Sequence, residues 1–172
     1  SISKVCQELG QPFIRYERAI ENISNAFLIE KFSDLRTYNL KNKSILLAVG
    51  VRHLKEAIIC VRNSGANVYA RVLANPESIR KTLSSSIKKS NFAVLNPSAS
   101  GDGKVEKALI RKWNINGVIC RQAGGMNEIF WHKICLSMGI DLWLLERPAG
   151  SKNINSVDSY EKLIKRLKSI NM

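Results

Sequence analysis

The sequence predicts an α/β protein in which a doubly wound, Rossmann-like parallel sheet of five strands carries helices on both faces. In residues 43–172, short apolar segments rich in β-branched residues alternate regularly with segments of helical periodicity, and this alternation is typical of βαβ units. The strand segments are almost continuously apolar, as expected where both faces of a sheet are covered. At 172 residues the chain is long enough to bury a sizeable core.

Residues 1–42 precede this alternation and are expected to be the end of a first α/β domain with a connecting segment. Residues 1–9 have a helical pattern that Gly10 ends, because glycine readily adopts the conformation found after a helix. Residues 12–16 (PFIRY) are predicted as a short strand. Residues 19–42 have weak periodicity and are predicted as the connection between the two units.

The second unit is predicted to contain five strands and five helices. The predicted strands are 44–49, 67–73, 91–95, 117–120 and 141–145. The predicted helices are 52–63, 76–87, 104–113, 127–138 and 157–170. Local signals support these boundaries: Asn75 is a natural N-cap with Pro76 in the first turn, and Gly65 and Gly139 close two helices.

Charge is the unusual feature of the composition. The chain has 27 Lys and Arg against 14 Asp and Glu, a formal net charge of +13. Such a field favours polyanionic partners, whether nucleic acid, anionic lipid or a polycarboxylate metabolite. No apolar run approaches the roughly 20 residues that span a bilayer, and the N-terminus lacks the pattern of a signal peptide. We therefore expect a cytoplasmic protein with no membrane partner.

The four cysteines are widely separated and form no CxxC pair. Because there is also no nearby cluster of histidines, we interpret Cys6, Cys60, Cys120 and Cys135 as buried, reduced thiols and predict no metal site.

The candidate binding residues follow the predicted strands, because ligands of doubly wound sheets bind beyond the carboxyl ends of the strands. Glycines allow backbone amides to approach an anion, helix N-termini add partial positive charge, and arginine forms two-pronged bonds to carboxylate or phosphate. These positions are Gly50, Arg71, Ser98, Arg121, Gly124, Gly125, Asn127 and Arg147.

Each of these residues also has a structural interpretation. Glycine is common at any βα turn, and residues 98–103 could form a simple flexible turn. Arg71 and Arg121 lie in or just after apolar strands, where an unpaired charge is costly, so each needs a partner. The sequence has neither GxGxxG nor GxxxxGK[ST]. His132 is interpreted as a core or surface histidine, and we assign no catalytic residue.

The strand ends resemble, in order and spacing, those of the precorrin-6A reductase family, which includes its cobalt-precorrin-6A counterpart. Residues 10–18 (GQPFIRYER) are similar to the family's GxPxxRxxRP pattern, with Ala19 in place of the proline. Residues 45–50 (ILLAVG) resemble its LLTTG strand, with Ala48 for a threonine, and residues 69–77 (YARVLANPE) resemble its RVLPxPE stretch.

The resemblance continues in the second half of the chain. Residues 117–125 (GVICRQAGG), followed by Lys133, resemble the family's xxVTKxSGG pattern, with arginine and alanine in place of the lysine and serine. Residues 144–148 (LLERP) correspond to its closing RP, whereas residues 96–98 (NPS) differ from its GPFS. The resemblance covers residues 2–148.

This resemblance implies an enzyme that uses NADPH to reduce a macrocycle double bond of precorrin-6A or cobalt-precorrin-6A in cobalamin biosynthesis. The cofactor would be NADPH and the substrate an anionic tetrapyrrole. Carboxylate or phosphate contacts are expected from Arg71, Arg121, Lys133 and Arg147, backbone approach at Gly50, Ser98, Gly124, Gly125 and Asn127, and further contacts from Arg15 and Arg18 of the first domain.

Members of the family open with a glycine-rich βα turn that helps to hold NADPH, and this motif is not in the chain. We therefore expect the chain to be the C-terminal part of such an enzyme, or a shortened member, and to be a monomer or weak homo-oligomer.

Two other classes of function stay open. A pI near 9.9 favours a nucleic-acid-binding module, although the strands lack RNP-like aromatics and the basic residues spread over many helices. A nucleotide-sensing α/β domain without catalysis would suit a degenerate Rossmann site. Binding of a polycarboxylate tetrapyrrole, compared with RNA, distinguishes these readings.

Overall fold

The computed structural model describes residues 2–18, 20, 25–96, 102–148 and 156–170, and the predicted site residue Ser98 lies outside these ranges. The helices are α1 (Ile2–Glu8), α2 (Val51–Asn63), α3 (Pro76–Leu83), α4 (Lys104–Lys112), α5 (Met126–Met138) and α6 (Tyr160–Ile170), with 3-10 helices η1 (Phe32–Thr37) and η2 (Lys89–Asn91). The strands are β1 (Arg15–Tyr16), β2 (Phe27–Ile29), β3 (Ser44–Ala48), β4 (Asn67–Val72), β5 (Phe92–Val94), β6 (Gly117–Arg121), β7 (Asp141–Leu145) and β8 (Ser156–Val157).

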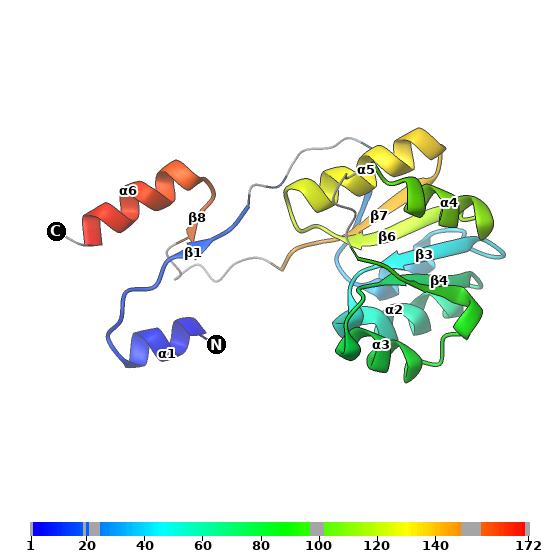
Figure 1. Ribbon diagram of the computed structural model, residues 1–172, viewed down its shortest axis with the longest axis horizontal. Helices are drawn as coiled ribbons and strands as arrows, with labels where there is room; N and C mark the ends of the chain where they lie inside the picture. Colours follow the sequence, from blue (N-terminus) through cyan, green and yellow to red (C-terminus); the bar gives the residue numbers. More distant parts are fainter. Residues whose placement is uncertain (1, 19, 21–24, 97–101, 149–155, 171–172) are drawn as a thin grey trace.

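A parallel sheet with the strand order β2-β7-β6-β3-β4-β5 forms the centre of the larger part of the molecule (Figure 1). This confirms the predicted doubly wound α/β fold. The sheet has one strand more than predicted, because β2 pairs with β7 at the edge. At three residues, β2 is too short to produce a recognisable periodicity, so its pairing with a distant segment is what defines it.

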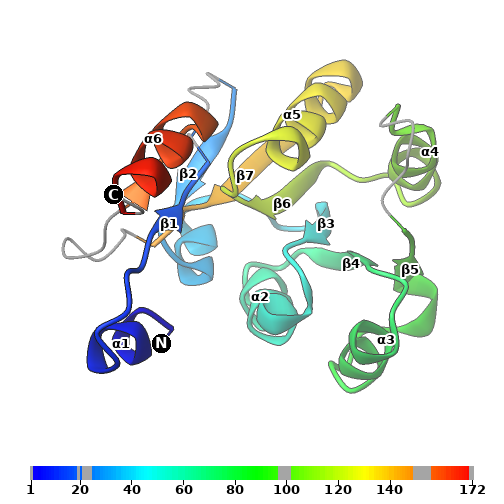
Figure 2. The same cartoon turned by 60° about the vertical axis from the view of Figure 1, so that its left-hand side comes forward.

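Helices cover both faces of this sheet, α2 and α3 on one side and α4 and α5 on the other (Figure 2). Successive side chains of each strand therefore enter two separate cores. Ile45 and Leu47 pack into the core under α2, whereas Leu46 packs under α4 and α5. Burial on both faces explains why the strands are almost continuously apolar in sequence.

The strand order reverses between β3 and β6. From β3 the chain proceeds outward through β4 and β5, and it then returns to β6, which pairs with the other edge of β3, before reaching β7. The helices that follow β3 and β6 lie on opposite faces, so their N-termini lie on either side of the sheet at the carboxyl ends of these two strands (Figure 2). In doubly wound sheets this topological switch point is where ligands bind.

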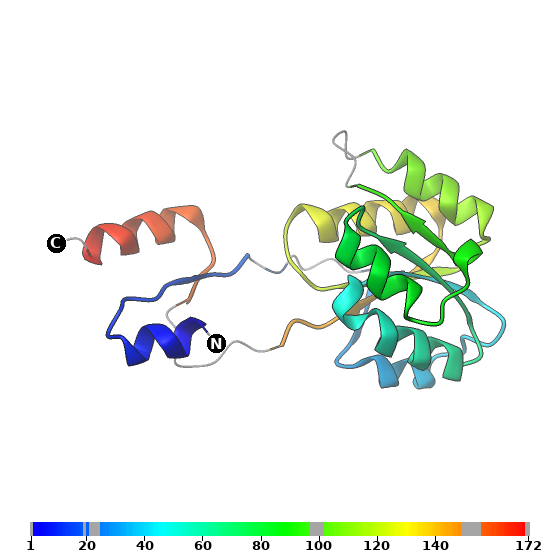
Figure 3. The same ribbon diagram turned by 60° about the horizontal axis from the view of Figure 1, so that its bottom comes forward.

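A second, smaller group of elements lies apart from the sheet and consists of α1, β1, β8 and α6 (Figures 1 and 3). Within it β1 pairs with β8 in parallel, Arg15 opposite Ser156. The grouping of elements differs from a division at residue 42, since β2 and η1 belong with the sheet and β8 and α6 with β1. The last helix begins at Tyr160, later than predicted, because the residues before it include the paired strand β8.

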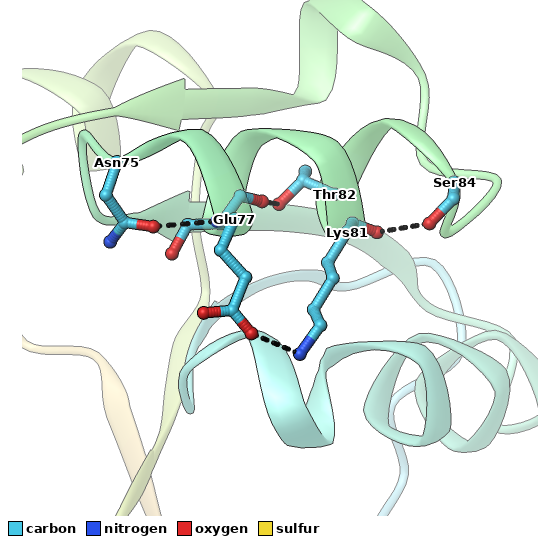
Figure 4. Close-up of polar contacts among 6 residues, drawn as sticks. Asn75, Glu77, Lys81, Thr82 and Ser84 are labelled. Carbon is cyan, nitrogen blue, oxygen red and sulfur yellow. Dashed lines mark hydrogen bonds and ion pairs between the residues drawn. The ribbon is translucent and has the colours of Figure 1, made fainter.

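Helix α3 shows how local side chains set an element's limits (Figure 4). Asn75 is the N-cap, as predicted, and its Oδ1 accepts a hydrogen bond from the amide of Ser78 at 2.8 Å. Lys81 Nζ pairs with Glu77 Oε1 at 2.6 Å along the exposed side. The helix ends earlier than predicted, where Ser84 Oγ donates to the carbonyl of Lys81 at 3.0 Å and so competes with further helical bonding.

Candidate functional site

Both helices that begin at the switch point start at a glycine. Gly50 is the N-cap of α2 (φ 79°, ψ 156°) and Gly125 that of α5 (φ 72°, ψ −163°), backbone conformations that are essentially restricted to glycine. Neither helix has a side-chain hydrogen bond at its cap, so the first amides and the positive end of each helix dipole can meet a bound anion. Among the residues that the structure describes, none has an atom within 4 Å of the position of a Cβ on Gly50.

A buried carboxylate orders the loop before α5. Glu128 is fully buried, and its Oε2 accepts a hydrogen bond from the amide of Gly124 at 2.8 Å. His132 lies one turn further along α5, where burial lowers its pKa and the neighbouring Glu128 charge partly opposes that shift. Glu128 was not among the predicted site residues. Its signal was nevertheless available, because it stands three residues after the N-cap, where glutamate often binds back to the start of a helix.

Arginines from three segments surround the start of α5. Arg121 is the exposed last residue of β6. Arg147 Nη1 donates to the carbonyl of Arg18 at 2.9 Å, and its own amide donates to Gln122 Oε1 at 3.3 Å. The Arg18 side chain lies over Gly125, where an added Cβ would be 3.1 Å from Arg18 Cδ. The structure thus brings Arg18, Gly125 and Arg147 together.

Arg18 and Arg147 also line a hollow of about 310 Å³ beside β8 and the start of α6, with Glu17, Asp158 and Lys162 among its other residues. The predicted site residue Arg15 lies in β1 and forms an ion pair with Glu17, Nε to Oε1 at 2.7 Å.

Three other predicted residues, Arg71, Asn127 and Lys133, line a separate pocket of about 440 Å³ between α4 and α5. The buried partner that Arg71 needs is Glu106, whose Oε1 lies 3.8 Å from Arg71 Nη2. Burial lowers the pKa of Arg71, and the Glu106 charge partly restores it. Glu106 was not predicted as a site residue, since nothing in the helical pattern of α4 distinguishes it from a solvated glutamate.

Two distinct environments therefore lie at the carboxyl edge of the sheet. The switch point offers glycine turns, helix N-termini and arginines, an arrangement suited to phosphate or carboxylate groups. The pocket combines apolar walls with the buried Arg71–Glu106 pair and with further charged residues, among them Lys107 and Lys133. Among the described residues, no group of three or more His, Cys, Asp or Glu side chains could hold a metal ion. Within the same ranges, the helices are all too short or too polar to cross a lipid bilayer.

Comparison with known proteins agrees with the family resemblance of the sequence. A family model described as precorrin-6x reductase CbiJ/CobK matches residues 1–168. A cobalt-precorrin-6A reductase of Synechocystis sp. is 24% identical over 156 residues, covering 86% of this chain and 58% of that protein. A cobalt-precorrin-6A reductase of Methanococcus maripaludis is 39% identical over 54 residues, 30% of this chain and 22% of that protein.

Among solved structures, a CobK precorrin-6A reductase matches 98% of this chain and 66% of its own length, with a TM-score of 0.72 and 16% sequence identity. At this identity the likeness shows the shared fold. The chain spans less than two thirds of the length of each of these three proteins.

Proposed function

The chain belongs to the precorrin-6x reductase family CbiJ/CobK, and from this membership we propose that it takes part in the NADPH-dependent reduction of a macrocycle double bond of precorrin-6A or cobalt-precorrin-6A in cobalamin biosynthesis. In this proposal the chain corresponds to the C-terminal part of such an enzyme and acts in the cytoplasm as a monomer or weak homo-oligomer. Its partner is an anionic tetrapyrrole.

The grouping of glycine turns, helix N-termini and arginines at the switch point is the observation that carries the proposal. Gly50 and Gly125 turn two helix N-termini toward it, and Arg121 and Arg147 follow the two adjacent strands. A corrin precursor carries many carboxylate side chains, and each can accept charge-assisted hydrogen bonds from arginine. The net charge of +13 extends the same attraction over a longer range.

The switch point also suits the phosphates of a dinucleotide, because no described residue occupies the Cβ position of Gly50, next to the amides that begin α2. When bound, NADPH supplies a hydride to one carbon of the double bond. We assign the accompanying proton, which adds to the other carbon, to solvent. His132 is poorly suited to deliver it, because it is buried and burial lowers its pKa.

A titration of the chain with a polycarboxylate porphyrin and, separately, with single-stranded RNA tests the proposed ligand class. We expect porphyrin binding that persists at the higher of two salt concentrations, and weak RNA binding that falls steeply with salt.

Arg121→Ala should weaken porphyrin binding roughly tenfold, the low end for loss of a charge-assisted bond. The control Lys88→Ala, at the N-cap of η2, should change it less than about twofold. Equal losses in both variants would rule out a specific site. Tight RNA binding without a porphyrin response would place the chain in the nucleic-acid class.

The cofactor is tested by titrating the chain with NADPH and NADH. We expect NADPH to bind more tightly, and Gly50→Ala to weaken its binding at least about fivefold by placing a methyl group in front of the α2 amides. Gly139→Ala is the matched control, since Gly139 also has a positive φ (63°) and open space around its Cβ position but lies at the far end of α5. Equal effects of the two substitutions, or equal binding of the two nucleotides, would contradict the cofactor assignment.

A further inference from the structure

Arg147 ties together the two segments through which the chain passes between the sheet and the smaller group of elements. One segment leads from β1 to β2 and the other from β7 to β8, and each of these strands pairs in parallel with a strand of the other segment. Arg147 lies shortly after β7, and its Nη1 donates to the carbonyl of Arg18, 129 positions earlier in the chain, at 2.9 Å. The hydrogen bond therefore fixes the Arg147 guanidinium on the backbone of the first segment.

The backbone around Arg147 is itself attached to the carboxyl edge of the sheet. Its amide donates to Gln122 Oε1 at 3.3 Å, and the Gln122 amide donates to the carbonyl of Leu145 at 2.8 Å. One residue earlier, the Glu146 amide donates to the carbonyl of Ile29 at 2.9 Å. Arg147 thus starts from a place set by β2, β6 and β7, and its side chain transfers that fixed position to residue 18.

The Arg18 side chain lies where its own charge does not favour it. Its Cδ and Nε are 3.1 Å and 3.8 Å from the position that a Cβ of Gly125 would occupy, and Gly125 is the N-cap of α5. A cation is repelled by the positive end of a helix dipole, and a long exposed side chain loses rotamer freedom when it is held in one place. The position of Arg18 therefore depends on an anchor, and the hydrogen bond from Arg147 supplies one at the backbone.

The charge of Arg18 is not compensated by the acidic residues near it. Both carboxylates that line the same hollow pair with other cations: Glu17 with Arg15 at 2.7 Å and Asp158 with Lys162 at 2.8 Å. None of the ion pairs between described residues involves Arg18. Its guanidinium is therefore free to bond an anionic group at the start of α5.

We propose that Arg147 is a positioning residue for the anionic ligand of the switch point. It acts through Arg18, whose backbone it holds, and makes no bond to the ligand itself. This role differs from the direct contact expected from the sequence, and it rests on the proposed function for the identity of the ligand. Arg121, the exposed last residue of β6, bonds the ligand independently of both.

The hold of Arg147 on residue 18 can be measured without any ligand. The carbonyl that accepts its hydrogen bond belongs to the peptide bond after Arg18, which is a site for trypsin, and cleavage requires local release of the backbone. We expect Arg147→Ala to speed cleavage after Arg18 at least about fivefold, as for loss of one hydrogen bond. Cleavage after the exposed Lys41 is the internal control and should change less than about twofold. Mass spectrometry of the released peptides gives both rates.

A double-variant cycle in the porphyrin titration separates positioning from direct contact. Arg18→Ala and Arg147→Ala should each weaken binding roughly five- to tenfold. The double variant should bind about as weakly as Arg18→Ala, because Arg147 then has no side chain left to position. Two independent contacts would instead multiply to a loss of up to roughly a hundredfold. The matched control is Arg121→Ala, which should keep its roughly tenfold effect in the Arg18→Ala background.

Multiplied losses for Arg18 and Arg147 would overturn the proposal, and so would an unchanged trypsin rate after Arg18 or an unchanged porphyrin affinity in a folded Arg147→Ala chain. If Arg147→Ala does not fold, as judged by its thermal unfolding, Arg147→Met keeps the aliphatic stem without the donor and takes its place in both measurements. Failure of the proposed function is a separate outcome. It would show as no porphyrin binding by the parent chain, whereas multiplied losses reject the positioning role alone.

Discussion

Replacing Gly125 by alanine tests the geometry at the switch point most directly. The backbone at Gly125 has φ 72° and ψ −163°, and a non-glycine residue there costs about 1–3 kcal/mol of strain. The new Cβ would also lie 3.1 Å from Arg18 Cδ. Because the Arg18 side chain can shift, we expect this contact to add less than about 1 kcal/mol.

Gly50→Ala and Arg18→Ala separate these two contributions. Gly50 has a similar backbone conformation, φ 79° and ψ 156°, but no atom of the described residues lies within 4 Å of its Cβ position, so Gly50→Ala should show the backbone cost alone. In the Arg18→Ala background the steric part should disappear, so the additional cost of Gly125→Ala, measured as the double variant minus Arg18→Ala, should be close to that of Gly50→Ala.

The assay is urea unfolding of the four variants and the parent chain, monitored by circular dichroism. Free energies of unfolding are compared between variants whose free energy has the same slope against urea concentration. The reasoning predicts a coupling of about 0.5–1 kcal/mol between Arg18 and Gly125. A Gly125→Ala cost below about 0.5 kcal/mol would refute the backbone assignment. A coupling indistinguishable from zero would show that Arg18 does not lie over the start of α5.

Three other perturbations probe the core and its titrating groups. Gly117→Ala should lower the free energy of unfolding by about 1–3 kcal/mol in urea, because the added Cβ would overlap the Trp143 ring; a neutral effect would contradict this packing. Burial lowers the pKa of His132 below its usual 6.5, so the unfolded chain binds a proton at higher pH than the folded chain does. The free energy of unfolding should therefore fall as the pH drops below about 6.5. His132→Gln should flatten this dependence between pH 7.5 and 5.5, and an unchanged slope would exclude His132 as its source. Burial also raises the pKa of the Cys120 thiol, so iodoacetamide should modify it far more slowly than the partly exposed Cys6, and equal rates by mass spectrometry would show that β6 is accessible.

The family and the main part of the fold could be predicted from local patterns. Strand segments that are buried on both faces of a sheet must be apolar throughout, and turn residues such as Asn75 and Gly139 act within one helical turn. Strands β3 to β7 and the helices between them were therefore predicted close to their observed limits, apart from the earlier end of α3. The expectation that all four cysteines are buried was only partly right. Cys120 and Cys135 are buried, whereas Cys6 and Cys60 are partly exposed, because α1 has no buried residues and Cys60 packs only against the margin of the core under α2.

The candidate site was predictable only in part, because local sequence patterns do not show which distant segments come into contact. Glycine turns and arginines at strand ends can be located once the strands are known, and Arg18, Gly125 and Arg147 do come together. The partners that define their chemistry come from other segments. Glu106 reaches Arg71 from a helix thirty-five residues away in the chain (106 − 71), and no local pattern encodes that approach.

The sequence by itself determined the family, the alternation of strands and helices, and the positive charge of the chain, because each depends on residue type and short-range spacing. Tertiary structure alone decided that β2 joins the sheet, that β1 pairs with β8, and that α4 and α5 enclose a pocket beside the buried Arg71–Glu106 pair. These features depend on backbone hydrogen bonds and pairs of buried charges between segments that are distant in the chain. Such contacts form only when the chain is folded.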